Sequence, residues 1–240
     1  MNGFRTLAAV VVSPRKAFDA LRVSPTFLFP LALLLVVNLG IQFVVYKVIA
    51  DDANFDRIAR DKVEWDATAA GIRLTPADAQ KQIEALRQQK QYWYAVPFFG
   101  IPVVIAALAI FFYLLLRLMR AGNTFRRVLS VVCWSFVIYR GIGGLVVAAS
   151  LLMRGSAHFF PVPAEAWSPT SLAHLIPRGA VPPNTYTAIS KLDPFLVWWL
   201  IVLAIGLSRT SNRLTMARSA TLVAGTEAVY LALNAAGLMP

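Results

Sequence analysis

Long apolar runs constrain what this chain can fold into more than any other feature of its sequence. A helix needs about 20 consecutive apolar residues to cross the hydrocarbon core of a bilayer. Five runs meet or approach that length, and the charged residues gather between them rather than within them. The five predicted spans cover approximately residues 26–48, 94–119, 128–153, 193–207 and 217–239.

The composition of the chain agrees with a membrane protein. Of its 240 residues, 58% are hydrophobic and only 15% are charged, whereas soluble domains are about 45–50% apolar. The formal net charge of +11 could suggest nucleic-acid binding, but the excess basic residues flank the apolar runs, which is how membrane topology is determined. We therefore expect an all-α polytopic membrane protein with five transmembrane helices and no nucleic-acid partner.

Basic residues are in excess over acidic residues in every second segment that lies outside the spans. The segments before the first span, between the second and third, and between the fourth and fifth hold eleven basic residues and one acidic residue. The connections at 47–93 and 154–193 hold eleven basic and ten acidic residues. Because basic-rich connections stay in the cytoplasm, the pattern predicts a cytoplasmic N-terminus and an extracytoplasmic C-terminus. The basic cytoplasmic rim is expected to attract anionic lipids.

Residues 1–25 are predicted to form a cytoplasmic segment with one short helix. The motif "SPRKAFDAL" supplies Ser13 as the N-cap and Pro14 at the first helical position. Phe18 and Leu21 then share an apolar side, because they are three residues apart. An amphipathic helix of this kind lies at the membrane interface.

Residues 26–240 form the predicted membrane domain, which carries two polar insertions. The first, 51–93, is predicted to be an extracytoplasmic helical hairpin: "TPADAQ" places Thr75 as an N-cap before a proline, and Gly71 supplies the turn. It is longer than a connector requires, so we expect it to bind a membrane-protein partner. The second, 154–192, is rich in proline, serine and aromatic residues and is predicted to be an extracytoplasmic cap.

Two charged residues fall inside predicted spans, where an isolated charge costs at least about 2.5–3.5 kcal/mol. Arg140 lies 12 residues into the third span and Glu227 lies 10 residues into the fifth. At a rise of 1.5 Å per residue, their depths differ by roughly 3 Å. We therefore predict a buried ion pair between them. Asn38 and Gln42, one turn apart on the first span, would accept further hydrogen bonds from Arg140, and Thr226 would add another hydrogen bond.

This predicted polar network is compatible with two kinds of function. In the first, it fixes how the helices pack, which the small residues beside both charges favour; the protein is then a scaffold or accessory subunit. In the second, it carries protons or ions, as intramembrane carboxylates often do; the protein is then a transporter or channel component. The spans show no internal repeat of the kind found in many transporters, so the first is preferred. Homo-oligomerisation stays open.

Enzymatic chemistry has little support in the sequence. His158 and His174 lie 16 residues apart with Glu165 between them, without the spacing of a helical HExxH motif. Cys133 is the single cysteine and lies in an apolar run. We expect no catalytic residues, no metal and no cofactor. A metal held by the two histidines is the one arrangement that would make the chain a membrane enzyme.

Three motifs suggest a family. They are "SPRKAFDAL" before a proline and the first span, "NTFRRVLSVVCWSFV" leading into the third span, and "LDPFLVWWLIVLAIGLSRTSNRLTMARSATL" through the fourth. Together with five spans, they resemble the bacterial branch of the Yip family, relatives of the Rab-interacting Golgi membrane proteins, over about residues 8–236 apart from the polar insertion. The resemblance implies a non-enzymatic protein of the bacterial inner membrane. It would act as a scaffold or accessory subunit, in membrane organisation or beside an ABC exporter.

Overall fold

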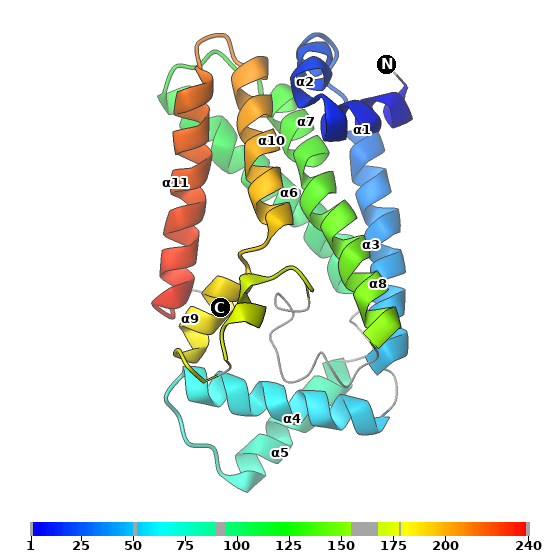
Figure 1. The fold of residues 1–240 in the computed structure, drawn as a ribbon, viewed down its shortest axis with the longest axis vertical. Coiled ribbons are helices and arrows are strands. Elements are labelled where there is room, and N and C mark those ends of the chain that lie inside the picture. The colour runs from blue at the N-terminus through cyan, green and yellow to red at the C-terminus, as the bar shows by residue number, and fades with distance from the viewer. Residues whose placement is uncertain (1, 50–51, 90–94, 155–167, 178, 239–240) are drawn as a thin grey trace. The chain divides into compact units, whose positions relative to one another are not determined.

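The computed structural model is helical, with no strand among the residues that it describes (Figure 1). The described residues are 2–49, 52–89, 95–154, 168–177 and 179–238. The chain divides into two compact units. The first unit comprises residues 1–38, 97–143 and 195–227, and the second comprises residues 39–96, 144–194 and 228–240.

The first unit begins with two short helices, α1 (Gly3–Val12) and α2 (Pro14–Val23). Helix α2 has the division expected from its sequence, because Phe18 and Leu21 are buried while Lys16 and Asp19 are exposed. Helix α1 was not expected. Its start is capped by the side chain of Asn2, which accepts a hydrogen bond from the Phe4 backbone N–H at 3.4 Å.

Helix α7 (Phe125–Phe136) forms the core of the first unit and is contacted by α1 and α2 (Figure 1). Trp134 is completely buried, and its ring stacks on Phe29 of α3 (Leu28–Ile49) at 5.8 Å. Its indole N–H donates to the Thr26 carbonyl oxygen at 3.0 Å, to which the Ser130 hydroxyl also donates at 2.8 Å. The start of α3 is thereby tied to α7. The π-helical segment η2 (Val137–Gly143) follows α7 directly.

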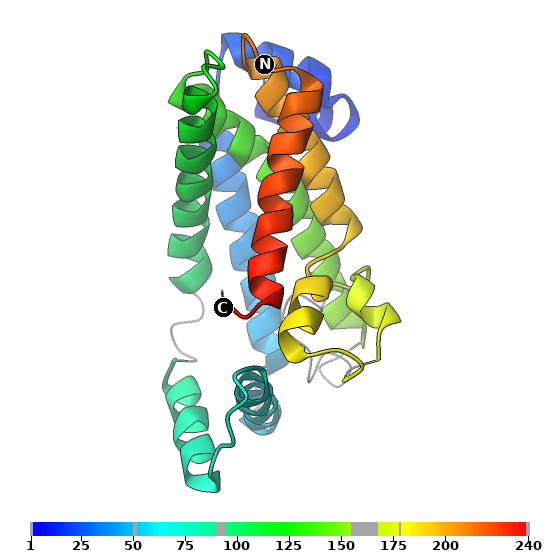
Figure 2. The same cartoon turned by 90° about the vertical axis from the view of Figure 1, so that its left-hand side faces the viewer.

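The second unit contains the polar insertion, which folds into α4 (Asp52–Ala69) and α5 (Pro76–Gln89) (Figure 1 and Figure 2). The chain turns between them at Gly71, whose φ is 67°, and Thr75 caps α5 by accepting from the Asp78 N–H at 3.2 Å. The two helices pack against each other. The second unit also contains three further elements: α8 (Gly144–Arg154), the 3₁₀ helix η5 (Leu172–Leu175) and α9 (Pro183–Ser190).

Within the described residues, three helical segments are long and apolar enough to cross a membrane, and a fourth is added if α9 and α10 (Pro194–Thr210) count as one interrupted span. The three are Leu28–Val45 in α3, Phe98–Leu118 in α6 (Ala95–Leu118) and Phe125–Met153 in α7, η2 and α8. They correspond to the first three predicted spans, and the interrupted one to the fourth. The fifth predicted span is a helix of 20 residues, α11 (Met216–Ala235), but Arg218, Glu227 and several hydroxyl groups make it more polar. Its crossing of the membrane stays a prediction.

Candidate functional site

Arg140 lies on an unusual stretch of backbone, the π-helical segment η2 that interrupts the third candidate span. Its side chain is exposed, and its guanidinium carbon lies 5.4 Å from the centroid of the neighbouring Tyr139 ring. That ring stacks on Trp199 of α10 at 5.7 Å. Because π-helical segments are rare and frequently occur at functional sites, the backbone around Arg140 marks this residue independently of its charge.

The other predicted polar residues lie on α3 and α11. The Asn38 amide donates to the carbonyl oxygen four residues earlier at 2.8 Å, and the Thr226 hydroxyl does the same at 2.9 Å. Both bonds therefore return to their own helix. Glu227 is half-buried in the first unit, and Gln42 is half-buried in the second. The ion pair between Arg140 and Glu227 stays a prediction.

The small residues near the two charges differ in their packing. A Cβ atom on Gly143 would lie 3.3 Å from Phe195 of α10, within the first unit. One on Gly144 would lie 2.6 Å from Ile41 of α3, within the second unit. One on Gly225 of α11 would have no neighbour within 4 Å. In the first unit, the close helix approach at Gly143 thus involves α10, and the α11 face at Gly225 is open within the described residues.

A second candidate site lies in the first unit, where α6 ends. The N–H of Arg120 donates to the Arg117 carbonyl at 3.0 Å, and the N–H of Ala121 donates to the Leu116 carbonyl at 2.9 Å. This pair of bonds is the Schellman motif, which requires a left-handed residue just past the helix. Arg120 is that residue, with a φ of 51°, although the position favours glycine. Left-handed backbone costs a residue with a side chain about 1–2 kcal/mol.

The loop after α6 is hydrogen-bonded to the loop after α10. The Ser211 hydroxyl donates to the Ala121 carbonyl oxygen at 2.6 Å, and the Asn212 N–H donates to the same oxygen at 3.2 Å. The Asn123 amide donates to the Thr210 hydroxyl at 3.4 Å. These bonds hold the two loops together, so the backbone segments that carry the pocket side chains are fixed relative to each other.

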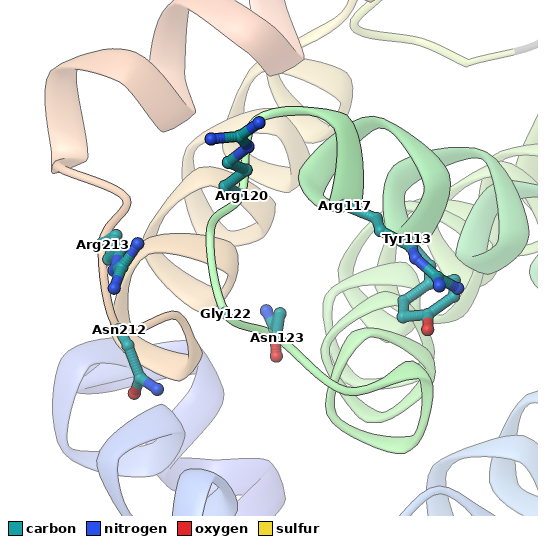
Figure 3. Close-up of a pocket in the computed structure, with 7 residues that line it drawn as sticks. All are labelled: Tyr113, Arg117, Arg120, Gly122, Asn123, Asn212 and Arg213. Carbon is teal, nitrogen blue, oxygen red and sulfur yellow. The ribbon is translucent and has the colours of Figure 1, made fainter.

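An open pocket of about 430 Å³ lies between these two loops. Figure 3 shows its lining, which comes from the last turns of α6 and from both loops: Tyr113, Arg117, Arg120, Gly122, Asn123, Asn212 and Arg213. The lining holds three guanidinium groups, two side-chain amides and one phenol hydroxyl. It contains no carboxylate.

The basic residues around this pocket differ in what they contact. Arg209 forms an ion pair with Asp19 at 2.8 Å. Arg22 donates to the Asn212 side-chain oxygen at 2.8 Å, and Arg127 donates to the Arg22 carbonyl oxygen at 3.0 Å. The three arginines that line the pocket are exposed, and within the described part of the chain none of them forms an ion pair. Their uncompensated charge makes the pocket attractive to anions.

Lys191 is a buried cation in the second unit, and no sequence motif marks it. Its side chain is 8% exposed. The ammonium group donates to the Tyr230 hydroxyl at 3.0 Å and to the Asn234 side-chain oxygen at 2.5 Å, and it lies 4.7 Å from the centroid of the Tyr230 ring. Neutral acceptors and an aromatic face stabilise the charge. The only sequence signal was a lysine just before an apolar run, because both partners lie about 40 residues further along the chain.

The histidines of the predicted cap are described only in part. The Nε2 atom of His174 lies 3.0 Å from the Ser168 carbonyl oxygen. His158 and Glu165 lie outside the described residues. Within the described ranges, no group of three or more His, Cys, Asp or Glu side chains is placed to hold a metal ion.

Comparison with known proteins supports the family suggested by the three sequence motifs. No match was found among curated proteins or among solved structures. The sequence profile of the Yip1 domain matches residues 8–237, a range that includes every candidate span, both loops of the pocket and Lys191. Because the match covers nearly the whole chain, and the chain folds into apolar helices long enough to cross a membrane, it belongs to the Yip1 domain family of membrane proteins.

Proposed function

We propose that this chain is a non-catalytic, five-span protein of a bacterial inner membrane that acts as a scaffold or accessory subunit. Helix α11 is the fifth span, the N-terminus is cytoplasmic and the C-terminus is extracytoplasmic. Family membership and the apolar helices support the membrane location. The uneven distribution of basic residues among the connections supports the orientation.

The arrangement of the first unit adds support for this orientation. The three basic-rich segments that should share the cytoplasm are the N-terminal segment, the loop after α6 and the loop after α10. They meet directly: Asp19 pairs with Arg209, and the Arg22 side chain donates to Asn212. The loop after α6 is bonded to the loop after α10 through Ala121. Segments on opposite sides of a bilayer could not form these contacts.

The observation that carries the accessory-subunit role is the structure of the polar insertion. Helices α4 and α5 bury Phe55, Val63 and Ile83 and are joined by an ion pair between Arg87 and Asp56 at 2.6 Å. The insertion therefore has packed tertiary structure of its own and does more than connect two spans. Its remaining faces are polar and exposed, and a charged, preformed surface suits specific protein contacts. We place the partner, an ABC exporter or another membrane protein, on α4 and α5.

Removing the insertion tests this role. The full chain and a variant with a short linker in place of residues 52–92 would each be extracted from native membranes in mild detergent. We expect the full chain to carry a stoichiometric partner and the linker variant to lose it, because the docking surface is gone. Size-exclusion chromatography followed by mass spectrometry of the complex measures the molar ratio of the partner to this chain.

A point variant outside the insertion serves as the control. Arg126→Gln removes one exposed charge from the first turn of α7 and leaves α4 and α5 unchanged. The partner should therefore be retained. If the linker variant also keeps the partner, or if the full chain is extracted alone, the accessory role of α4 and α5 is wrong.

A transporter or channel component is the second candidate function, and the π-helical segment that carries Arg140 favours it. In this function Arg140 and Glu227 line a polar path that water enters. A cysteine at Glu227, in a Cys133→Ala background, would then react with a hydrophilic maleimide in inverted membrane vesicles, whose cytoplasmic face is outward. For a scaffold we expect that cysteine to stay unlabelled, whereas a control Arg218→Cys, exposed in the first turn of α11, reacts in both cases. Mass spectrometry of the labelled protein distinguishes the two functions.

A further inference from the structure

The pocket between the loop after α6 and the loop after α10 combines features that a membrane scaffold does not require. It holds Arg117, Arg120 and Arg213, together with the amides of Asn123 and Asn212, and no carboxylate. We propose that this pocket binds a phosphomonoester group, presented either by an anionic lipid headgroup or by a small phosphorylated solute. The proposal stands or falls independently of the scaffold role, because it concerns a different part of the chain from α4 and α5.

The lining chemistry selects phosphate. Guanidinium groups are planar forks whose N–H donors match pairs of phosphate oxygens. Amide N–H groups on Asn123 and Asn212 and the hydroxyl of Tyr113 supply further donors around the same volume (Figure 3). A phosphomonoester carries a charge of about −1.5 to −2 at neutral pH and three terminal oxygens, so three guanidinium groups suit it better than they suit a singly charged phosphodiester.

The backbone at Arg120 supports a binding role separately from the charges. The Schellman motif at the end of α6 needs a left-handed residue, and glycine would adopt that conformation without strain. An arginine there places a guanidinium at the edge of the pocket at a cost in stability. Strained residues of this kind cluster at functional sites and ligand clamps.

Membrane topology alone does not explain the arrangement. Basic residues that set orientation need only lie near the ends of spans. They need not line the same pocket, and their loops need not be joined by hydrogen bonds such as those from Ser211 and Asn212 to Ala121. Arg126 illustrates the difference, since it is exposed in the same connection but does not line the pocket.

The experiment compares three lipids on the purified full-length protein. Phosphatidic acid carries a phosphomonoester, phosphatidylglycerol carries a phosphodiester on the same backbone, and phosphatidylcholine, a zwitterion with no net charge, provides the background. Native mass spectrometry in mild detergent counts the lipids retained. We expect phosphatidic acid to be retained at least about ten-fold more strongly than phosphatidylglycerol, corresponding to about 1.4 kcal/mol.

The variants are chosen so that misfolding cannot imitate loss of binding. Arg120→Gly removes a pocket guanidinium and relaxes the left-handed backbone, so its melting temperature should be equal to or higher than that of the wild type while its retention of phosphatidic acid falls. Arg213→Gln should reduce retention similarly. Arg126→Gln removes the same charge from the same connection outside the pocket and should retain phosphatidic acid like the wild type.

Competition with glycerol 3-phosphate separates the two sources of the phosphate. Displacement of phosphatidic acid by this solute, together with direct binding in calorimetry, supports a soluble ligand at the pocket. Retention of phosphatidic acid in excess solute supports a lipid headgroup. Equal retention of phosphatidic acid and phosphatidylglycerol overturns the proposal. The proposal is also overturned if Arg126→Gln and the two pocket variants lose retention of phosphatidic acid equally. The lipid would then be held by the general positive charge of this surface and not by the pocket.

Discussion

Replacing Trp134 with alanine should lower the free energy of unfolding by about 3–5 kcal/mol, the range found for large aromatic side chains in well-packed cores. The side chain is completely buried, stacks on Phe29 and donates to the Thr26 carbonyl. Truncation therefore leaves a cavity and also frees the start of α3 from α7. Because van der Waals packing drives helix association in membranes, the loss persists in a bilayer. Unfolding of the detergent-solubilised protein by SDS titration measures it.

Trp134→Phe separates the cavity from the hydrogen bond. The phenyl ring preserves most of the packing against Phe29 but cannot donate to the Thr26 carbonyl. That oxygen keeps the hydroxyl of Ser130 as a donor. The free energy of unfolding should therefore fall by only about 1 kcal/mol. Equal losses for the alanine and phenylalanine variants would show that the hydrogen bond, and not the packed ring, holds α3 to α7.

Local patterns were sufficient to predict much of the helical framework. The apolar runs corresponding to α3 and α6 are long enough to cross a bilayer. Such runs become helices, because every backbone N–H and C=O group in hydrocarbon must find its hydrogen-bond partner within the segment. Helices α2 and α5 carry N-terminal signals in "SPRKAF" and "TPADAQ", and both helices begin at the predicted proline. Helix α1 was not predicted, because "GFRTLAAVVV" is too short for a span and its cap, Asn2, is a weak signal by itself.

The sites were harder to predict, because each depends on residues that meet only in three dimensions. The pocket needs the loop after α6 to meet the loop after α10, and no spacing in "RLMRAGNTF" or "RTSNRL" encodes that contact. The π-helical segment around Arg140 interrupts an apolar run whose pattern predicts one continuous helix. The burial of Lys191 requires Tyr230 and Asn234 from α11.

Charge in this chain has at least three physical uses. Arg209 is neutralised locally by Asp19. Lys191 is buried on neutral acceptors and an aromatic face, where its removal would leave polar groups without a donor. The pocket arginines are left uncompensated on a preformed surface. A single count of basic residues predicts a topology, but it cannot distinguish these environments. The pocket and the buried lysine therefore emerge only from the structure.

Gly206→Leu should destabilise the protein by about 3 kcal/mol, at the upper end of the usual cost of overpacking. Even a Cβ atom at this position in α10 would lie 2.5 Å from a methyl group of Val131 and 3.0 Å from the Phe18 ring. Both neighbours are completely buried, so neither can move into open space. Helices α2 and α10 would have to separate from α7. SDS titration and the yield of folded protein would both report the loss.

Gly225→Leu is the matched control, and it also tests the open question of homo-oligomerisation. Both glycines lie inside helices, but a Cβ on Gly225 meets nothing within 4 Å. Because glycine in a helix interior is less favourable than leucine by roughly 0.5–1 kcal/mol, an isolated chain should become slightly more stable. If the variant instead loses stability and changes from a dimer to a monomer on size-exclusion chromatography, a second copy covers this face of α11. Small residues permit such close helix approach, and leucine would prevent it.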